Sequence, residues 1–311
     1  MKHLILGAAG FIGTNLAIQL SKQEDIDLIL VDEKKEYFKR LEELQLRNAE
    51  LRIQTFSNDM DFDSLLDGVD VLYHLVSTSI PANSNQQVPQ ELMSNVVFTS
   101  LLLEACVRQK VSKVVFISSG GTVYGKEACC PLNEETPTYP INSYGVQKIA
   151  IEKLLYLYHH MYNLDYRVIR LSNPYGPYQR PNGILGAVTT FTERALKDEP
   201  IVVYGDGSVV RDFIYIDDAI RAIITIAKDD AKYKTYNVGS GCGVSIQELV
   251  EIVQSVLKKK SIIEYKQGRK VDVPVNYLDI SRYEKEFGQL VFFTIEEGIK
   301  RTASFLMKHD E

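Results

Sequence analysis

The chain has 311 residues, of which 45% are hydrophobic and 24% are charged, and its formal net charge is −6. These values are typical of a globular protein with one large or two small domains and exclude an extended disordered chain. An acidic balance without a basic stripe argues against nucleic acid as a partner. No stretch approaches the roughly 20 apolar residues that cross a bilayer, so we expect no membrane association and a cytoplasmic location.

The four cysteines give no sign of a disulfide framework or a metal centre. Cys129 and Cys130 are adjacent, a spacing that suits neither a disulfide pair nor a zinc site. We therefore expect no metal.

Short β-rich runs alternate with helical patterns through the first part of the chain. The expected strands are residues 2–6, 27–32, 51–56, 70–75, 113–118 and 165–171, and helical spacing marks residues 11–21, 36–48, 89–109 and 142–162. Such alternation indicates βαβ units, in which right-handed crossovers place helices on both faces of a parallel sheet. The sequence therefore predicts an α/β fold with a Rossmann-type, doubly wound parallel sheet over residues 1–171.

The texture of the sequence changes in the second part, where Gly, Pro and Asn cluster over residues 172–183. The elements expected after this cluster are strands at 201–205 and 236–239 and helices at 217–227, 245–257 and 294–308. This mixture predicts a smaller α/β domain over residues 172–311 that mainly binds substrate. Residues of about 205–235 are expected to cross back to the first domain.

A glycine-rich loop, GAAGFIG, lies between the first expected strand and the first expected helix. Gly7 permits a tight turn, Gly10 lets the backbone approach a pyrophosphate, and Gly13 lets the helix pack closely on the strand. Gly10, Phe11, Ile12 and Gly13 open the helix, whose free N–H groups and dipole attract phosphate. The loop predicts a dinucleotide site, and the alternative is that the glycines serve helix packing only.

An acidic residue, Asp32, ends the second expected strand. Its distance along the chain from the glycine loop suits hydrogen bonding to the adenosine ribose hydroxyls. Glu33 follows directly and would repel a 2′-phosphate. The pair predicts NAD rather than NADP as the cofactor.

Tyr144 and Lys148 lie four residues apart in the expected helix 142–162 and therefore share one helix face. A phenol with a pKa of about 10 is a poor base at neutral pH. A nearby ammonium group is expected to lower that pKa, so that Tyr144 can take a proton from a substrate hydroxyl as its carbon loses hydride. Lys148 is expected also to hold the nicotinamide ribose.

With these motifs in place, the sequence resembles the extended short-chain dehydrogenases/reductases, and within them the NAD-dependent sugar-nucleotide epimerases that are similar to UDP-glucose 4-epimerase. The resemblance runs nearly end to end. It includes GAAGFIG (7–13), Asn58-Asp59-Met60, YHLVS (73–77), Asn95, SSGGTVYG (118–125), YGVQK (144–148), RLSNPYGPYQ (170–179), VVYGDGSVVRDFIYIDD (202–218), NVGSG (237–241) and GRKVDVP (268–274). By this resemblance Asp59 and Met60 contact adenine, and Leu75 and Asn95 belong to the cofactor pocket.

The resemblance also implies a UDP-sugar as substrate. Asn173 resembles the residue that touches the substrate pyrophosphate, Arg211 and Arg269 resemble its phosphate-binding arginines, and Asp272 resembles a uridine-ribose contact. Two guanidinium groups converging on a diphosphate make chemical sense, because each binds phosphate through two hydrogen bonds.

Asn276 falls, by the same resemblance, where the family places a gate beside the hexose. A bulky Tyr at the gate restricts the site to plain hexoses, whereas the smaller Asn276 predicts that N-acetylhexosamines are admitted, with a possible hydrogen bond to the acetamido group. A shift of one residue in the alignment puts Tyr277 at the gate and reverses this prediction. A third reading is that Asn276 simply ends a strand.

One position departs from the family pattern. The family usually has Ser or Thr third in the SSGGTVYG octet, where its hydroxyl bonds the reacting sugar hydroxyl, and this sequence has Gly120. Either Ser119 or Thr122 then supplies the hydroxyl, with a slight preference for Thr122, or Tyr144 acts alone.

The leading functional hypothesis is 4-epimerisation of a UDP-hexose or UDP-N-acetylhexosamine through a transient 4-keto sugar. A 4,6-dehydratase is disfavoured because Gly121 and Thr122 replace its Asp-Glu pair, while a decarboxylase acting on UDP-glucuronate shares the oxidation step and stays open. A catalytically silent NAD-binding regulator is a further alternative. The helices at 89–109 and 142–162 carry apolar residues on more than one face, which, with the family resemblance, predicts a homodimer.

Overall fold

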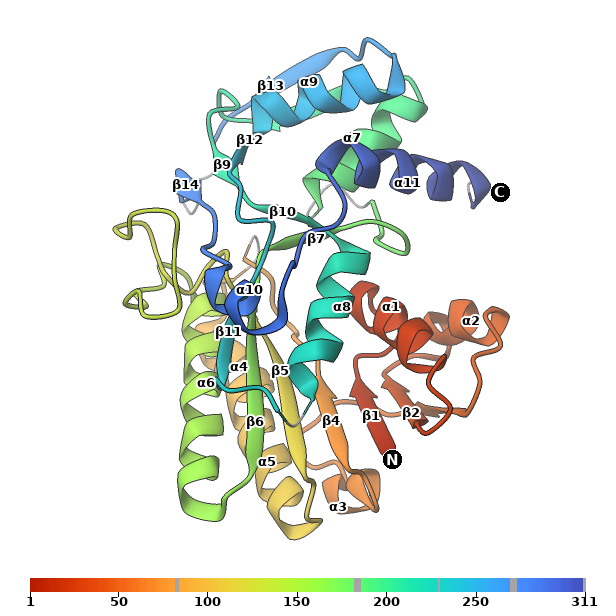
Figure 1. Ribbon diagram of the computed structural model, residues 1–311, viewed down its shortest axis with the longest axis vertical. Coiled ribbons are helices and arrows are strands. Elements are labelled where there is room, and N and C mark those ends of the chain that lie inside the picture. Colours follow the sequence, from red (N-terminus) through yellow and green to blue (C-terminus); the bar gives the residue numbers. More distant parts are fainter. Residues whose placement is uncertain (82–83, 182–185, 229, 269–272, 310–311) are drawn as a thin grey trace. The chain divides into compact units, whose positions relative to one another are not determined.

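The structure is a computed structural model that describes residues 1–81, 84–181, 186–228, 230–268 and 273–309 (Figure 1). Arg269 and Asp272, the expected phosphate and ribose contacts, lie outside the described residues. The chain forms two compact units. Unit 1 comprises residues 1–119, 142–169 and 226–235, and unit 2 comprises residues 120–141, 170–225 and 236–311. Each unit therefore gathers distant parts of the chain, and residues 120–141 group with the later segments.

A seven-stranded sheet forms the centre of the Rossmann-type fold. Its strands are β1 (Lys2–Leu6), β2 (Asp27–Asp32), β3 (Ala49–Ile53), β4 (Val71–His74), β5 (Lys113–Ser119), β6 (Asp165–Leu171) and β11 (Thr235–Val238), in the order β11-β6-β5-β4-β1-β2-β3. The pairs among β1 to β5 are parallel. The strand order reverses between β1 and β4, and ligands of open α/β sheets bind at the carboxyl ends of the strands at such a point. The predicted doubly wound fold is confirmed.

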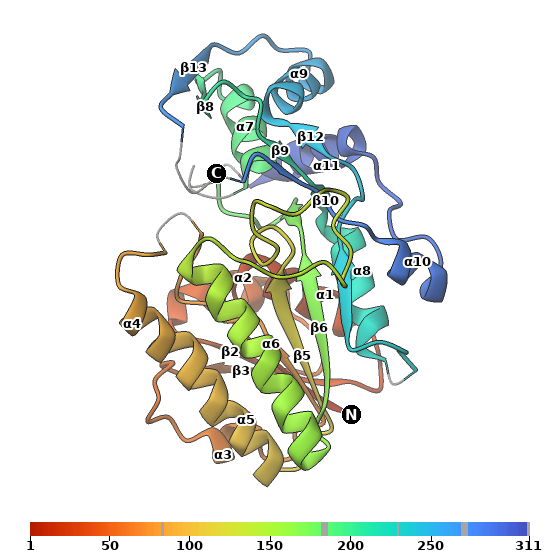
Figure 2. The same ribbon diagram turned by 90° about the vertical axis from the view of Figure 1, so that its left-hand side faces the viewer.

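Helices cover both faces of the sheet within unit 1. They are α1 (Phe11–Leu20), α2 (Lys35–Glu43), α3 (Phe62–Leu66), α4 (Val88–Leu92), α5 (Phe98–Arg108) and α6 (Ser143–Tyr162). Figure 2 shows α5 and α6 side by side over one face, with α1 and α2 behind the strands. The apolar faces of α3, α5 and α6 pack with the sheet in one buried hydrophobic cluster, which fixes α6 against β5.

Most expected elements lie within one residue of the observed bounds, but the expected helix 36–48 ends at Glu43 in α2, and two further elements differ. The expected helix 89–109 is interrupted by a π-helical turn, η1 (Met93–Val97), between α4 and α5. The expected strand 51–56 runs instead over β3, because β3 is an edge strand whose single partner, β2, ends at Asp32, opposite Ile53. The strand at 165–171 has the bounds that the sequence predicts.

Unit 2 is a mixed α/β assembly of short strands and amphipathic helices. Its elements are β7 (Asn173–Tyr175), α7 (Ala187–Leu196), β8 (Ile201–Tyr204), β9 (Val210–Arg211), β10 (Phe213–Tyr215), α8 (Ile216–Ala227, whose last two residues belong to unit 1), β12 (Val244–Ser245), α9 (Ile246–Leu257), β13 (Ile263–Lys266), β14 (Val275–Asn276), α10 (Ser281–Phe287) and α11 (Ile295–Lys308). Capping boxes at Ser245 and Thr294 start α9 and α11. Strand β9 lies between β12 and β14 and brings residues from three distant segments together.

Candidate functional site

The glycine loop after β1 has the close-packed geometry that its three glycines predict. Gly7 has φ of +91°, a conformation that favours glycine. A Cβ on Gly13 would lie 2.3 Å from the carbonyl oxygen of Gly7 and 2.7 Å from Cα of Ala8, so only glycine lets α1 approach the loop. Gly10 is the N-cap of α1 and makes no side-chain cap bond. The first turn of α1 therefore presents backbone N–H groups without a capping side chain, as a phosphate site requires.

Asp32 closes this loop from the end of β2. The buried carboxylate accepts hydrogen bonds from the backbone N–H groups of Ala9 at 2.9 Å and of Glu33 at 2.8 Å. A carboxylate has about four lone-pair positions and is a suitable acceptor for ribose hydroxyls. The exposed Glu33 adds a second negative charge beside it. The glycine cradle and the acidic strand end fit an adenine dinucleotide without a 2′-phosphate.

The other expected cofactor residues lie around the same ends of β1, β3 and β4. Asp59 is exposed after β3, whereas the side chain of Met60 packs in the hydrophobic cluster. Leu75 donates its N–H to the carbonyl of Leu6 and so extends β4 beside β1. The buried Asn95 accepts a hydrogen bond from the N–H of Thr78 and also donates to the side chain of Gln147 on α6. Asn95 thus fixes the loop that follows β4.

The ends of β5 and α6 bring Ser119 and Tyr144 together. The side chain of Asn142 accepts a hydrogen bond from the N–H of Gly145 and caps the start of α6, so that Tyr144 lies in the first turn of the helix. Tyr144 is partly buried, and loss of hydration raises its pKa to about 12, while its hydrogen bond with the Ser119 side chain opposes that rise. The sequence predicts a net lowering of this pKa, whereas the structure gives a net rise, because burial outweighs the hydrogen bond with Ser119.

Lys148 is buried one helical turn beyond Tyr144. Its Nζ donates to the carbonyl of Ile117 at 2.8 Å and lies 4.7 Å from the ring centre of Phe116 and 5.4 Å from that of Tyr144. Burial lowers the pKa of Lys148 to about 8, although the charge of Glu152 raises it. At neutral pH the lysine is therefore mainly an ammonium ion held against the end of β5.

Gly120 is packed so closely that a side chain at this position would require Leu278 to move. A Cβ at this position would lie 2.6 Å from Cδ1 of Leu278 and 3.0 Å from the carbonyl oxygen of Arg170. Leu278 therefore occupies the space that a Ser or Thr at position 120 needs. Thr122, two residues further on, has an enclosed Oγ1 without a hydrogen-bond partner among the described residues.

The expected substrate residues Asn173, Arg211 and Asn276 come together in unit 2. The backbone N–H and side-chain amide of Asn173 donate to the carbonyl oxygen of Asp212, at 3.1 and 2.9 Å. Arg211 pairs with Asn276 across β9 and β14, and its Nη1 donates to the carbonyls of Val210 and Val273. Asn173, Arg211 and Asn276 therefore lie close together around Arg211 and Asp212.

Asp212 is the buried residue that connects this cluster to neighbouring segments of unit 2. Its fully buried carboxylate accepts hydrogen bonds from the N–H of Ser240 at 2.6 Å, the hydroxyl of Ser240 at 2.8 Å and the N–H of Leu278 at 3.1 Å. Burial raises the pKa of Asp212, and the bonds with Ser240 lower it. The sequence analysis missed Asp212, although a carboxylate directly after Arg211 and before a strand is a detectable signal.

Asn276 and its neighbour Tyr277 face different surroundings. Asn276 is 1% exposed and its Nδ2 donates to the carbonyl oxygen of Gly120 at 3.2 Å, while its Oδ1 is enclosed and has no partner among the described residues. Tyr277 packs its ring against Gly243, where a Cβ would lie 2.9 Å from Cδ1. Asn276, not Tyr277, therefore contacts the octet loop.

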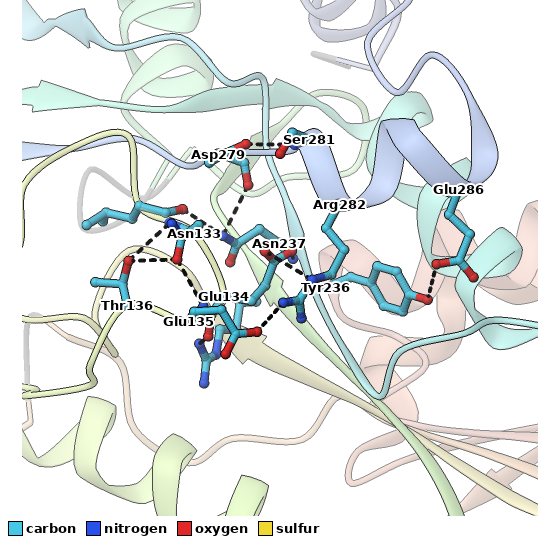
Figure 3. A network of polar contacts seen from close by, with 12 residues as sticks. Asn133, Glu134, Glu135, Thr136, Tyr236, Asn237, Asp279, Ser281, Arg282 and Glu286 are labelled. Carbon is cyan, nitrogen blue, oxygen red and sulfur yellow. Dashed lines mark hydrogen bonds and ion pairs between the residues drawn. The ribbon is translucent and has the colours of Figure 1, made fainter.

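A second polar network, shown in Figure 3, fixes the loop that leads from the octet to α6. Asn237 accepts a hydrogen bond from the hydroxyl of Tyr124 at 2.6 Å and donates to the carbonyls of Leu132 and Asp279. Its backbone N–H donates to Glu134, which pairs with Arg282 at 3.4 Å. The network was not predicted, since its members come from three distant segments.

The doubly wound sheet, the glycine loop at its switch point and the pair of Tyr144 and buried Lys148 define a nucleotide-dependent enzyme of the Rossmann class. The chain belongs to the NAD dependent epimerase/dehydratase family, whose family model matches residues 3–239. The resemblance, the enzyme class and the NAD cofactor that the sequence predicts are thereby confirmed at the level of this family.

Known proteins resemble the chain over its whole length. It is 31% identical over 307 residues to a UDP-glucose 4-epimerase of Mycolicibacterium smegmatis, covering 98% of both chains. The crystal structure of UDP-glucose 4-epimerase with UDP-glucose from Thermotoga maritima is 30% identical, covers 100% of both chains and has a TM-score of 0.91. The UDP-N-acetylglucosamine 4-epimerase from Methanobrevibacter ruminantium M1, in complex with UDP-N-acetylmuramic acid, is 28% identical, covers 99% of this chain and 98% of that one, and has a TM-score of 0.89.

Across the described ranges, every helix is too short or too polar to cross a membrane.

Proposed function

We propose that the protein interconverts the C4 epimers of a UDP-hexose or UDP-N-acetylhexosamine through a 4-keto sugar. The observation that carries this proposal is the contact of Ser119 with Tyr144 above the buried Lys148, at the carboxyl end of β5. A Tyr–Lys pair in this position suits proton removal from a secondary alcohol. The names of the similar enzymes supply the substrate class and the reacting carbon.

Tyr144 has the role of general base and then general acid at the sugar 4-hydroxyl. Bound NAD, held by the glycine loop and Asp32, would supply the hydride acceptor and donor. Ser119 donates a hydrogen bond to the phenolate, and the Lys148 ammonium favours the same ionised form. Because the pKa of Lys148 is about 8, we expect turnover to decline as the pH rises above that value and the lysine loses its charge.

The glycine loop and Asp32 hold the adenosine diphosphate half of NAD. On the substrate side, Asn173 and Arg211 contact the pyrophosphate of the UDP-sugar. Arg269 and Asp272 keep the roles that the family resemblance gives them, as proposed contacts to phosphate and uridine ribose.

We expect Ser119→Ala to reduce kcat by about tenfold or more, because it removes the hydroxyl that bonds Tyr144. Thr122→Val is expected to have a smaller effect, which revises the slight preference for Thr122. The comparison is made by measuring kcat of both variants in steady-state assays. Thermal midpoints show whether each variant is folded. A large loss in Thr122→Val with full activity in Ser119→Ala would restore Thr122 as the catalytic hydroxyl.

The reaction type is tested by incubating the purified protein with UDP-glucose, UDP-galactose, UDP-N-acetylglucosamine and UDP-glucuronate and resolving the products by NMR. Interconversion of C4 epimers supports the proposal. Loss of water with formation of a 6-deoxy-4-keto sugar indicates a dehydratase, and release of CO₂ from UDP-glucuronate indicates a decarboxylase. A protein that binds NAD and turns over none of these sugars fits the silent regulator.

Asn276 supports tolerance of a 2-N-acetyl group, because it is a small residue with an unpaired acceptor beside the octet loop. We expect measurable turnover of UDP-N-acetylglucosamine, and we expect Asn276→Tyr to lower kcat/KM for this sugar by about tenfold or more relative to UDP-glucose. Asn276→Gln is the matched control, since it keeps the amide. Brisk turnover of UDP-glucose with none of UDP-N-acetylglucosamine would contradict the prediction.

The outer face of α6 supports the predicted homodimer. This face exposes large apolar side chains, which are Val146, Tyr156, Leu157 and Met161. A face of this kind on a helix that is also buried on its other side suits a second protein surface. Both the dimer and the cytoplasmic location are predictions from the sequence. Light scattering of the purified protein measures whether it is a dimer.

A further inference from the structure

A third polar residue continues the line of Tyr144 and Lys148 on α6. Glu152 lies four residues beyond Lys148 and therefore on the same helix face. Each of the last three residues of β5 makes a hydrogen bond with one of these side chains. Ser119 bonds Tyr144, the carbonyl of Ile117 accepts from Lys148, and the hydroxyl of Ser118 donates to Glu152.

Glu152 is an unusual residue for a hydrophobic helix face, since it is only 7% exposed. A buried carboxylate is costly unless it is hydrogen-bonded or paired with a positive charge. The oxygen–oxygen distance between Ser118 and Glu152 is 2.5 Å, which is typical of a hydroxyl donating to an ionised carboxylate. Glu152 therefore places a hydrogen-bonded carboxyl group one helical turn beyond the buried Lys148.

Two further titratable groups in the described part of the chain, His74 and Tyr166, lie within electrostatic reach of this pair. His74 on β4 is completely enclosed, bonds Thr99 at 2.9 Å, and has its pKa lowered to about 3 by burial and by the charge of Lys148. Tyr166 on β6 lies within electrostatic reach of Glu152, and burial raises the pKa of this phenol. At neutral pH both groups are uncharged, so Glu152 is the charged neighbour that opposes the burial of Lys148.

We propose that Glu152 is a positioning residue that keeps Lys148 protonated in its buried place against β5. This inference rests on the proposed role of Lys148 in turnover. The negative charge favours the ammonium form, and the hydrogen bond from Ser118 fixes the carboxyl group of Glu152 against the end of β5. Without the charge, burial acts unopposed and Lys148 loses its proton at a lower pH.

The test is Glu152→Gln, which keeps the shape and an acceptor for Ser118 but removes the charge. The pKa of Lys148 is read directly by NMR of protein labelled with ¹³C at lysine Cε, with its signal assigned by its absence in Lys148→Met. We expect a value of about 8 in the wild type and a value about one unit lower in Glu152→Gln. Glu104→Gln, which removes a half-exposed charge from α5, is the matched control and should leave the Lys148 titration unchanged.

The pH dependence of kcat/KM with UDP-glucose or UDP-N-acetylglucosamine gives a second measurement. At pH 8 we expect Glu152→Gln to be about fivefold below the wild type, with the two converging towards pH 6. A loss that is equal at every pH indicates a merely structural role and would overturn the inference. An unshifted Lys148 titration would overturn it too.

If Glu152→Gln does not fold, Glu152→Asp provides a second test of whether the charge at position 152 sets the pKa of Lys148. This variant retains the charge, so its Lys148 should titrate close to the wild-type value, and a shift of about one unit would overturn the inference. Lys148→Met separates this inference from the proposed function. If Lys148→Met keeps full turnover, the role of Lys148 fails. If Lys148→Met loses turnover, but Glu152→Gln leaves the pKa of Lys148 unchanged, only the inference about Glu152 fails.

Discussion

Tyr144→Phe should lower kcat/KM by about 10²–10⁴-fold while the protein keeps its fold and its NAD, because the variant loses only the phenolic oxygen that moves the proton. The missing hydrogen bond with Ser119 is worth about 1 kcal/mol, so the thermal midpoint should change little. Steady-state kinetics with thermal melts and analysis of the released nucleotide measure the three properties.

Tyr156→Phe is the matched control, since Tyr156 lies on the same helix with a side chain that is 60% exposed. It should retain wild-type kinetics. Activity of Tyr144→Phe within about tenfold of the wild type would remove Tyr144 from the catalytic role.

Gly13→Ala should destabilise the protein by about 3 kcal/mol and abolish retention of NAD, because its Cβ would meet rigid backbone at 2.3 Å from the Gly7 oxygen. The loop and α1 must then separate, and the thermal midpoint should fall by roughly 5 °C or more. Nucleotide released by denaturing the wild type should be NAD(H), and the variant should release none.

Gly10→Ala separates packing from phosphate binding. A Cβ on Gly10 meets only the Gly7 oxygen at 3.3 Å, and the φ of −73° is open to alanine. We expect this variant to keep a thermal midpoint close to that of the wild type but to bind less NAD, since the methyl group occupies the approach to the pyrophosphate. Equal stability of Gly10→Ala and Gly13→Ala would contradict the packing role of Gly13. Release of NADP from the wild type would contradict the role of Asp32 and Glu33.

Local patterns in the sequence predicted the parts of the fold that local physics decides. The glycine spacing of Gly7, Gly10 and Gly13 requires a tight turn and a close helix, and both are present. The four-residue spacing of Tyr144 and Lys148 predicts a shared helix face, which α6 provides. Glu152 continues the same spacing, so the pattern that revealed the pair could also have revealed the third residue.

The contacts that the sequence did not predict join residues far apart in the chain. Gly120 has no room for a hydroxyl because Leu278 fills the space, and the two are 158 positions apart. Likewise, the burial of Asn276 depends on the carbonyl of Gly120, and the raised pKa of Tyr144 depends on packing that no spacing reveals. The π-helical turn within the expected helix 89–109 is also set by tertiary contacts, since Asn95 bonds both the loop after β4 and α6.

The most direct test of the proposed epimerisation follows the hydrogen at C4 of the sugar. UDP-glucose and UDP-N-acetylglucosamine carrying deuterium at C4 are incubated with the purified protein in ordinary water, without added NAD, and the products are read by NMR and mass spectrometry. Because hydride leaves and returns to the same carbon within one site, the C4 epimer should form and keep its deuterium at C4. Product that has lost the deuterium to water, or the absence of any C4 epimer from either sugar, would contradict the proposed function.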